Sequence, residues 1–443
     1  MRVVFQMIFI IFILIKNSIL LSSLLVYYKI QYEKNLSKLG KNLCKALHTL
    51  GPAFVKLGQF LSTRNDLINS TICNELRTLQ DNAPSVEFSK IERILICELK
   101  NKYSNIIIDS QPVATASIAQ VHKGEINGEL VAIKVLKPGI RKMFLKNIDF
   151  MMFVATLINK FIQPAKRLRL KEVVNIIQNT ANIELDMQME AAVASKLKEN
   201  ENTSVYIPKI FWEYTTKNVL VSEWIDGTRI ENIDESHRQD VAERLAFTFF
   251  SQAFVNGFFH ADIHPGNILF DIHNRIVLLD FGVCSYLPEK DRILLAQIIY
   301  YFAIKNYEKV AELHLKAGYV KYKKNNYDEI KNNFALACRT IAEPVFGKSS
   351  AEISMSTFLR RLFEVTSEFN MHTQPQLILL QKNIVSLEGV LKTLNINVNM
   401  WTLIQPWFTN WIEQNLSVKF TIKRQYNRIL NILEKLESLI ERS

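Results

Sequence analysis

The sequence has few cysteines and lacks the marks of several protein classes. Its five cysteines are scattered through 443 residues, are odd in number and form no CxxC pair. This argues against a disulfide framework or a zinc site and fits a reducing compartment. No repeat of fixed period and no long polar tract occurs, which argues against a repeat protein or a disordered chain. The net charge is +11, but there is no nucleic-acid motif, so no nucleic-acid partner is expected.

A long apolar run stands near the N-terminus. Residues 3–15 are nearly all apolar, Lys16 and Asn17 interrupt the run, and residues 18–28 are apolar again. The whole stretch could span a bilayer, which needs about 20 apolar residues. A lysine near its middle favours an interfacial or kinked segment instead. We therefore expect residues 1–28 to associate with membrane lipids, with spanning and interfacial placement both open.

The remaining pattern alternates between helical and strand signals. Asn127-Gly128 lies between two apolar, β-branched runs, which is a strong hairpin signal. A second, short hairpin is predicted at residues 268–280, with Asn274 at its turn. The predicted order is helix over 29–100, strands over 111–136, helix over 140–200, a strand pair from Pro208 to Glu223, and mainly helix from residue 237.

Two segments match the parts with which protein kinases hold ATP phosphates. A stretch of small residues precedes the first hairpin, where kinases place a glycine-rich loop. Alanine permits close approach of backbone amides to phosphate but not glycine's positive φ angles, so this loop should be stiffer. The strand that follows the hairpin turn carries V-A-I-K, and Lys134 within it needs a counter-charge or a phosphate. The predicted nucleotide-loop residues are Val113, Ala114, Thr115, Ala116, Ser117, Ile118, Ala119, Gln120 and Val121.

Three acidic residues lie on a predicted helix after the lysine strand. Glu190 is expected to pair with Lys134 and to align it on the phosphates, as a helical glutamate does in kinases. Glu184 and Asp186 lie one to two turns earlier and should point elsewhere, because six residues turn a helix by about 240°.

The most specific segment combines a catalytic-loop spacing with a D-F-G. Asp262 is followed five residues later by Asn267, and Asp280 begins the D-F-G. Asp262 is predicted to accept a hydroxyl proton or to position a nucleophile, while Asn267 and Asp280 supply hard oxygen ligands for Mg²⁺. His260 and His264 flank Asp262, and structural hydrogen bonding is the expected role of both.

The order of these motifs predicts an α+β, two-lobed protein-kinase-like fold. The last strand of the first lobe ends at Glu223-Trp224-Ile225, where the backbone of Glu223 and Ile225 would read the adenine edge of ATP or ADP. The predicted domains are a helical extension over 29–110, an N-lobe over 111–225 and a largely helical C-lobe with its extension over 226–443.

One further segment lies outside any kinase motif. Residues 50–64 contain Lys56-Leu57-Gly58-Gln59, and the string resembles the KxGQ signature of the UbiB family. Other matches extend the resemblance over roughly residues 40–290, with a weaker match around residues 400–407. They are Leu79-Gln80-Asp81, the segment 116–122, Glu184-Leu185-Asp186 and the segment 260–267.

The resemblance implies a helical KxGQ segment across the active-site cleft, with Lys56 and Gln59 in a regulatory role. Lys56 would pair with Glu184 or Asp186, leaving Glu190 to Lys134. It also implies a Mg²⁺-dependent ATPase that supports ubiquinone biosynthesis at the cytoplasmic face of a bacterial inner membrane. Its expected partners are membrane lipids and ubiquinone precursors or biosynthetic enzymes.

Several features bear on competing functions. There is no A-P-E and no room for a long activation loop before the helix-like segment 288–299, which disfavours ordinary protein phosphorylation. A small-molecule phosphotransferase of the aminoglycoside or choline kinase type would lack KxGQ. A non-catalytic nucleotide-binding scaffold would not need Lys134 and both aspartates. Many family members carry an apolar C-terminal hairpin, whereas residues 412–443 are charge-interspersed and cannot span a bilayer.

Overall fold

The chain forms two compact units. Unit 1 comprises the described residues up to 83 and those of 142–177, and unit 2 comprises the described residues of 84–141 and of 178–443. The computed structural model describes residues 32–62, 68–76, 78–79, 84–161, 170–199, 204–320, 324–346, 375–394, and the single positions 358, 359, 361, 362, 365, 369 and 411. The predicted apolar segment 1–28 and the C-terminal stretch 412–443 lie outside these residues.

Unit 1 is helical, and the KxGQ sequence holds part of it together. Its helices α2, α3 and α4 pack on one another. A Cβ at Gly58 would lie 2.7 Å from Leu47 Cδ1 and closer still to Leu79 Cδ1, so a larger residue there would force these two leucine side chains to move. Gln59 donates from Nε2 to the Leu79 carbonyl at 3.3 Å. The elements are α2 (Tyr32–Leu50), α3 (Pro52–Ser62), α4 (Ser70–Leu76), most of α6 (Ile140–Phe161) and the first part of α7 (Leu170–Glu184).

Unit 2 begins with a four-stranded antiparallel sheet in the order β1-β2-β3-β5. Alternate residues of β3 are buried against the Ile91, Leu95 and Leu99 face of α5, as the strand period of two and the helix period of 3.6 require. Asn127 and Gly128 both have positive φ, as a type I′ hairpin needs, which confirms the predicted turn. The elements are α5 (Phe88–Leu99), β1 (Ile106–Thr115), β2 (Ala119–Ile126), β3 (Glu129–Leu136) and β5 (Val219–Glu223).

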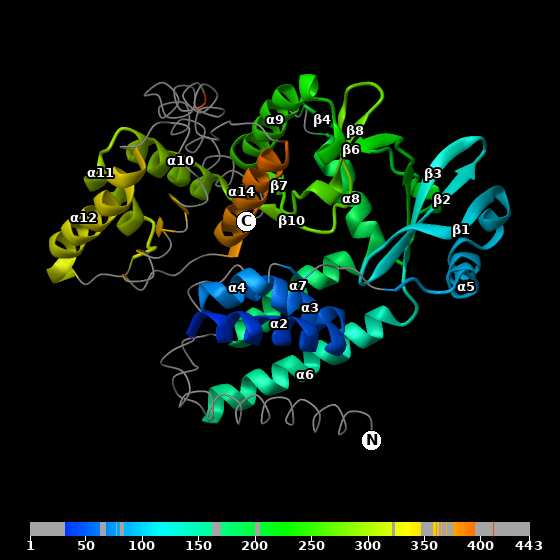
Figure 1. The fold of residues 1–443 in the computed structure, drawn as a ribbon, viewed down its shortest axis with the longest axis horizontal. Coiled ribbons are helices and arrows are strands. Elements are labelled where there is room, and N and C mark those ends of the chain that lie inside the picture. The colour runs from blue at the N-terminus through cyan, green and yellow to red at the C-terminus, as the bar shows by residue number, and fades with distance from the viewer. Residues whose placement is uncertain are drawn as a thin grey trace, which may run out of the picture. The chain divides into compact units, whose positions relative to one another are not determined.

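The rest of unit 2 is mainly helical (Figure 1). Its core combines aliphatic side chains with a group of phenylalanines. The hairpin predicted at 268–280 is confirmed, with Asn274 at a φ of 58°. Two small sheets have the orders β4-β9-β8-β6 and β10-β7. The elements are α8 (Met187–Lys198), β4 (Val205–Tyr206), β6 (Gly227–Arg229), α9 (Glu235–Phe250), β7 (Phe258–His260), β8 (Ile268–Asp271), β9 (Ile276–Leu278), β10 (Cys284–Tyr286), α10 (Glu289–Ala303), α11 (Tyr307–Lys316), α12 (Tyr327–Phe346) and α14 (Pro375–Thr393).

Two predicted elements differ in the structure. The strand pair expected from Pro208 to Glu223 is reduced to β5 and one isolated bridge between Ile210 and Ser222, because β5 pairs instead with β3. The helix expected over 140–200 is interrupted at Leu185-Asp186. There the Asp186 side chain accepts the backbone N–H groups of Gln188 and Met189 and caps a new helix.

The division into units does not follow the predicted ranges. Helix α5 was expected in the N-terminal extension, but it packs on the sheet of unit 2. Most of α6 was expected in the N-lobe, but it belongs to unit 1. Hydropathy and length identify no membrane-spanning helix among the residues that the structure describes. All five cysteines are free thiols, as predicted.

Candidate active site

Lys134 of β3 makes a buried ion pair with Glu190 of α8. Its Nζ lies 2.7 Å from Glu190 Oε1, and the glutamate side chain is only 2% exposed. This confirms the pairing predicted from the sequence. Burial opposes the charged form of Lys134, but the carboxylates of Asp280 and Glu190 outweigh it and raise the pKa of the lysine. Loss of one partner from such a buried pair costs about 3–5 kcal/mol, so the pair fixes β3 against α8.

The D-F-G carboxylate lies at the same lysine. Asp280 Oδ1 is 3.1 Å from Lys134 Nζ and accepts the Gly282 N–H at 3.2 Å. The Asp280 backbone is left-handed, with a φ of 51°, and about half of its side chain is exposed. The Phe281 N–H donates to Glu190 Oε1 at 3.3 Å. The lysine, the helical glutamate and the D-F-G therefore form one cluster with an accessible carboxylate.

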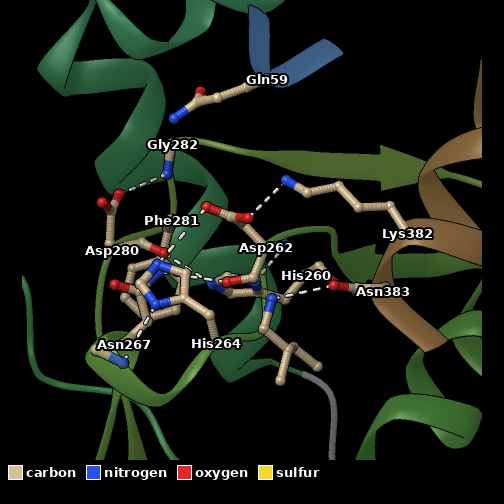
Figure 2. Close-up of polar contacts among 12 residues, drawn as sticks. Gln59, His260, Asp262, His264, Asn267, Asp280, Phe281, Gly282, Lys382 and Asn383 are labelled. Carbon is tan, nitrogen blue, oxygen red and sulfur yellow. Dashed lines mark hydrogen bonds and ion pairs between the residues drawn. The ribbon is translucent and has the colours of Figure 1, made fainter. Parts of the chain in front are cut away.

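The catalytic-loop residues are held by His260, which is fully buried at the end of β7 (Figure 2). Burial lowers the pKa of His260, which favours the neutral ring. Its Nδ1 accepts the Asp262 N–H at 3.1 Å, and its Nε2 contacts the Asp280 carbonyl at 2.7 Å. A neutral imidazole with its proton on Nε2 satisfies both contacts. His260 thus links the loop to the D-F-G, and the predicted structural role is confirmed.

Asn267 and His264 complete the loop. Asn267 Nδ2 donates to the Asp262 carbonyl at 3.2 Å, which leaves the amide oxygen as the acceptor end of a nearly buried side chain. His264 accepts the Gly266 N–H on Nδ1 at 3.1 Å. The Asn267 amide oxygen and the Asp280 carboxylate are hard oxygen donors of the kind Mg²⁺ prefers. The donor chemistry therefore fits the predicted metal.

Sequence reasoning missed two residues of α14 that contact this loop (Figure 2). Lys382 Nζ lies 2.6 Å from Asp262 Oδ1. Asn383 is buried, donates from Nδ2 to the His260 carbonyl, and accepts the Ile263 N–H at 3.0 Å. The available signal was a polar Gln-Lys-Asn triplet between two apolar stretches of the helix, but nothing in that helix indicates the partner 120 residues earlier.

The predicted nucleotide-loop stretch comprises the end of β1, the turn at residues 116–118 and the start of β2. The Ala116 N–H donates to the Ala119 carbonyl at 2.9 Å and closes the turn. Lys137, a residue that sequence reasoning missed, donates from Nζ to the Ala116 carbonyl at 2.7 Å and to the Pro84 carbonyl at 3.0 Å. Its backbone N–H bonds the Ile118 carbonyl at 2.8 Å. Lys137, which directly follows β3, therefore holds the turn through hydrogen bonds from both its side chain and its backbone.

Gln120, one of the predicted nucleotide-loop residues, has a side chain that holds other parts of the sheet lobe together. Gln120 is completely buried, and its amide bonds both backbone groups of Val86 and the ring of His122. Its side chain therefore braces the sheet, and the predicted approach of this loop's backbone amides to phosphate stays a prediction. Val113 lies at the other extreme, with 57% of its surface exposed.

The predicted hinge lies at the end of β5. The Glu223 carboxylate accepts the Tyr206 hydroxyl at 2.7 Å and the Lys209 N–H at 3.0 Å. The Trp224 N–H donates to the Leu130 carbonyl at 3.1 Å. These contacts fix the chain leaving the sheet. The adenine-reading role of the Glu223 and Ile225 backbone stays a prediction.

The acidic residues assigned to KxGQ do not share a helix with Glu190. Glu184 is the last residue of α7, and Asp186 caps α8. Glu184 is nearly buried, and its Cγ lies 3.3 Å from the position that a Cβ on Gly282 would take. Lys56 and Gln59 belong to unit 1, whereas Glu184 and Asp186 belong to unit 2. The pairing of Lys56 with either acid stays a prediction.

The sheet lobe, the Lys134–Glu190 pair and the loop joined to the D-F-G define an atypical kinase-like protein. Comparison with known families agrees, since residues 78–314 match the ABC1 atypical kinase-like domain and residues 338–399 match the UbiB helical domain. The chain belongs to the UbiB family of atypical kinase-like proteins.

Relatives match over most of their length. The "Probable protein kinase UbiB" of Marinobacter nauticus is 38% identical over 410 residues, which cover 89% of this chain and 74% of that protein. The protein of the same name from Histophilus somni is 35% identical over 437 residues, covering 94% and 79%. The solved structure of Rv3197 with erythromycin from Mycobacterium tuberculosis aligns with a TM-score of 0.55 and 23% identity, covering 84% of this chain and 96% of that one. That likeness shows the fold alone.

Proposed function

We propose that the chain is a Mg²⁺-dependent ATPase that supports ubiquinone biosynthesis at a bacterial membrane. The observation that carries the proposal is the cluster of Lys134, Glu190 and Asp280, joined through His260 to the loop bearing Asp262 and Asn267. The quinone role rests on family membership, and membrane association rests on the apolar residues 1–28. ATP or ADP is the proposed nucleotide.

Each side chain of the cluster has a distinct proposed task. Lys134, aligned by Glu190, would bind phosphate oxygens, and the turn at Ala116 would offer backbone amides to them. Asn267 and Asp280 would hold Mg²⁺, which when bound offsets the negative charge of the phosphates. Asp262 would accept a proton from an attacking water. As it does so, the water oxygen would bond to the γ-phosphorus, and the bond between that phosphorus and the departing ADP oxygen would break.

The chain after the D-F-G supports hydrolysis over phosphorylation of generic proteins. Strand β10 begins two residues after Gly282 and pairs with β7, and α10 begins at Glu289. Residues 283–288 are too few for the long activation segment on which protein kinases seat a peptide. We therefore propose slow ATP hydrolysis, stimulated by lipid or a quinone-like ligand, with little transfer to generic protein substrates.

The test separates binding from turnover with two variants. Asp280→Asn removes a carboxylate charge from the proposed metal site, so Mg-nucleotide should no longer raise its melting temperature as it does in the wild type. Asp262→Asn should still bind Mg-nucleotide but lose ATP hydrolysis. Phosphate release and thermal shift are measured with and without anionic liposomes. Equal stabilisation of all three proteins by Mg-nucleotide, or full turnover by Asp262→Asn, would contradict the assignment.

A further inference from the structure

The contact between Lys382 and Asp262 stands apart from an ordinary surface ion pair. The lysine ammonium lies 2.6 Å from Asp262 Oδ1, and the two side chains are 34% and 29% exposed. Exposed pairs on mobile side chains add little to stability. Here both residues are partly buried, and the carboxylate is the proposed proton acceptor. This location suggests that the ion pair acts on the proton acceptor itself and does more than stabilise the fold.

The position of Lys382 is fixed by its neighbour in the helix. Asn383 bonds the His260 carbonyl and the Ile263 N–H, which lie on either side of the Asp262 peptide. Those two bonds set both the axial position and the rotation of α14 against the loop. The same helix packs on α9 and β10. The buried hydrogen bonds of Asn383 therefore hold the neighbouring Lys382 where its ammonium contacts the Asp262 carboxylate.

The charges around the loop explain why a cation is needed there. The segment from Asp262 to Asn267 contains no lysine or arginine, and its one basic side chain, His264, approaches Asp262 Oδ2 with Nε2 only to 3.8 Å. Lys134 is already shared between Glu190 and Asp280. An ionised carboxylate in this position would repel the phosphates that it must approach, and its rotation would be set weakly. An ammonium with three donors can offset that charge and fix the carboxylate's orientation.

We propose that Lys382 is a positioning residue for phosphoryl transfer, supplied to the catalytic loop by the UbiB helical domain. It holds the Asp262 carboxylate in the orientation that receives the proton of the attacking water. The inference rests on the proposed ATPase function and deepens it. It assigns the helical domain a direct part in turnover, so that displacement of α14 would switch the site off without emptying the nucleotide site.

The test compares charge removal with charge retention at one position. Lys382→Met keeps the aliphatic stem and removes the ammonium, while Lys382→Arg keeps a cation. Lys392→Met makes the same change at an exposed position on the same helix and serves as the control. ATP hydrolysis gives kcat and KM, fluorescent-nucleotide titration gives the Kd for Mg-ADP, and thermal unfolding reports folding.

Lys382→Met should lower kcat by about 10- to 100-fold, as misplacement of a catalytic group does, with Kd and melting temperature close to wild type. Lys382→Arg should recover most of kcat, and Lys392→Met should match the wild type. Wild-type or faster turnover by Lys382→Met overturns the proposal, as does a lost kcat that follows a fall in melting temperature and is not recovered by arginine. No turnover by the wild type itself would instead refute the ATPase function, and the role of Lys382 with it.

Discussion

Asn383→Ala isolates the anchor between α14 and the catalytic loop. Asn383 is 1% exposed, and the two backbone groups that it bonds belong to His260 and Ile263, which are 0% and 2% exposed. Alanine can replace neither bond, and water has little access to the site. The variant should therefore leave a buried carbonyl and a buried N–H without their partner and leave a small cavity.

The cost follows from those two groups. A buried polar group that loses its partner costs about 1–3 kcal/mol, so two of them cost about 2–6 kcal/mol. At about 2–4 °C per kcal/mol for a large domain, the melting temperature should fall by at least about 4 °C. Because the loop also carries Asp262, kcat should fall with it, unlike the clean loss of kcat expected for Lys382→Met.

Differential scanning calorimetry and phosphate release measure the two effects. Asn333→Ala, an exposed position on α12, controls for the substitution itself. A melting temperature within about 1 °C of wild type, together with normal turnover, would refute the view that these bonds hold the loop.

Three further predictions concern other parts of the chain. Lys137→Met removes the bonds from Nζ to the carbonyls of Ala116 and Pro84, so the Kd for Mg-ADP should rise several-fold; an unchanged Kd in a fluorescence titration would show that the turn is held without it. Burial lowers the pKa of His314 to about 4, so the folded protein binds fewer protons than the unfolded chain between about pH 4 and 6.5. The free energy of unfolding therefore falls by up to about 3 kcal/mol as the pH falls through that window. Between pH 7.5 and 5 the melting temperature of His314→Leu should fall less than that of the wild type, and equal falls would contradict this. Deleting residues 1–28 should move the protein from the membrane pellet to the soluble fraction, whereas a truncated chain that still pellets after a high-salt wash would place the anchor elsewhere.

Local sequence determined the parts of the site that lie within short segments. The loop from Asp262 to Asn267 and the hairpin around Asn127-Gly128 are held by contacts between near neighbours, so a fixed spacing carries a fixed geometry. The D-F-G was identified by its residue types, although its contacts with Lys134, Glu190 and His260 are long-range. Lys134 was identified in the same way, because a charge in an apolar strand requires a partner. Glu190 is the partner of Lys134, as predicted. The predicted reason was incomplete, because the sequence pattern favours one continuous helix, whereas in the structure a helix break separates Glu184 from Glu190 and Asp186 caps the second helix.

Only the tertiary structure decided what reaches the site from a distance. Lys382 and Asn383 contact a loop 120 residues earlier. Polar residues within a helix specify no partner until the helix is packed. Gln120 belongs to the predicted nucleotide-loop stretch, but it lies in β2, and the hydrogen bonds of its side chain with Val86 give that side chain a bracing role. The assignment of α5 to the sheet unit and of most of α6 to the helical unit likewise depends on which apolar faces meet. Periodicity shows that a face will be buried, but the partner that covers it is chosen by the packing of the whole chain.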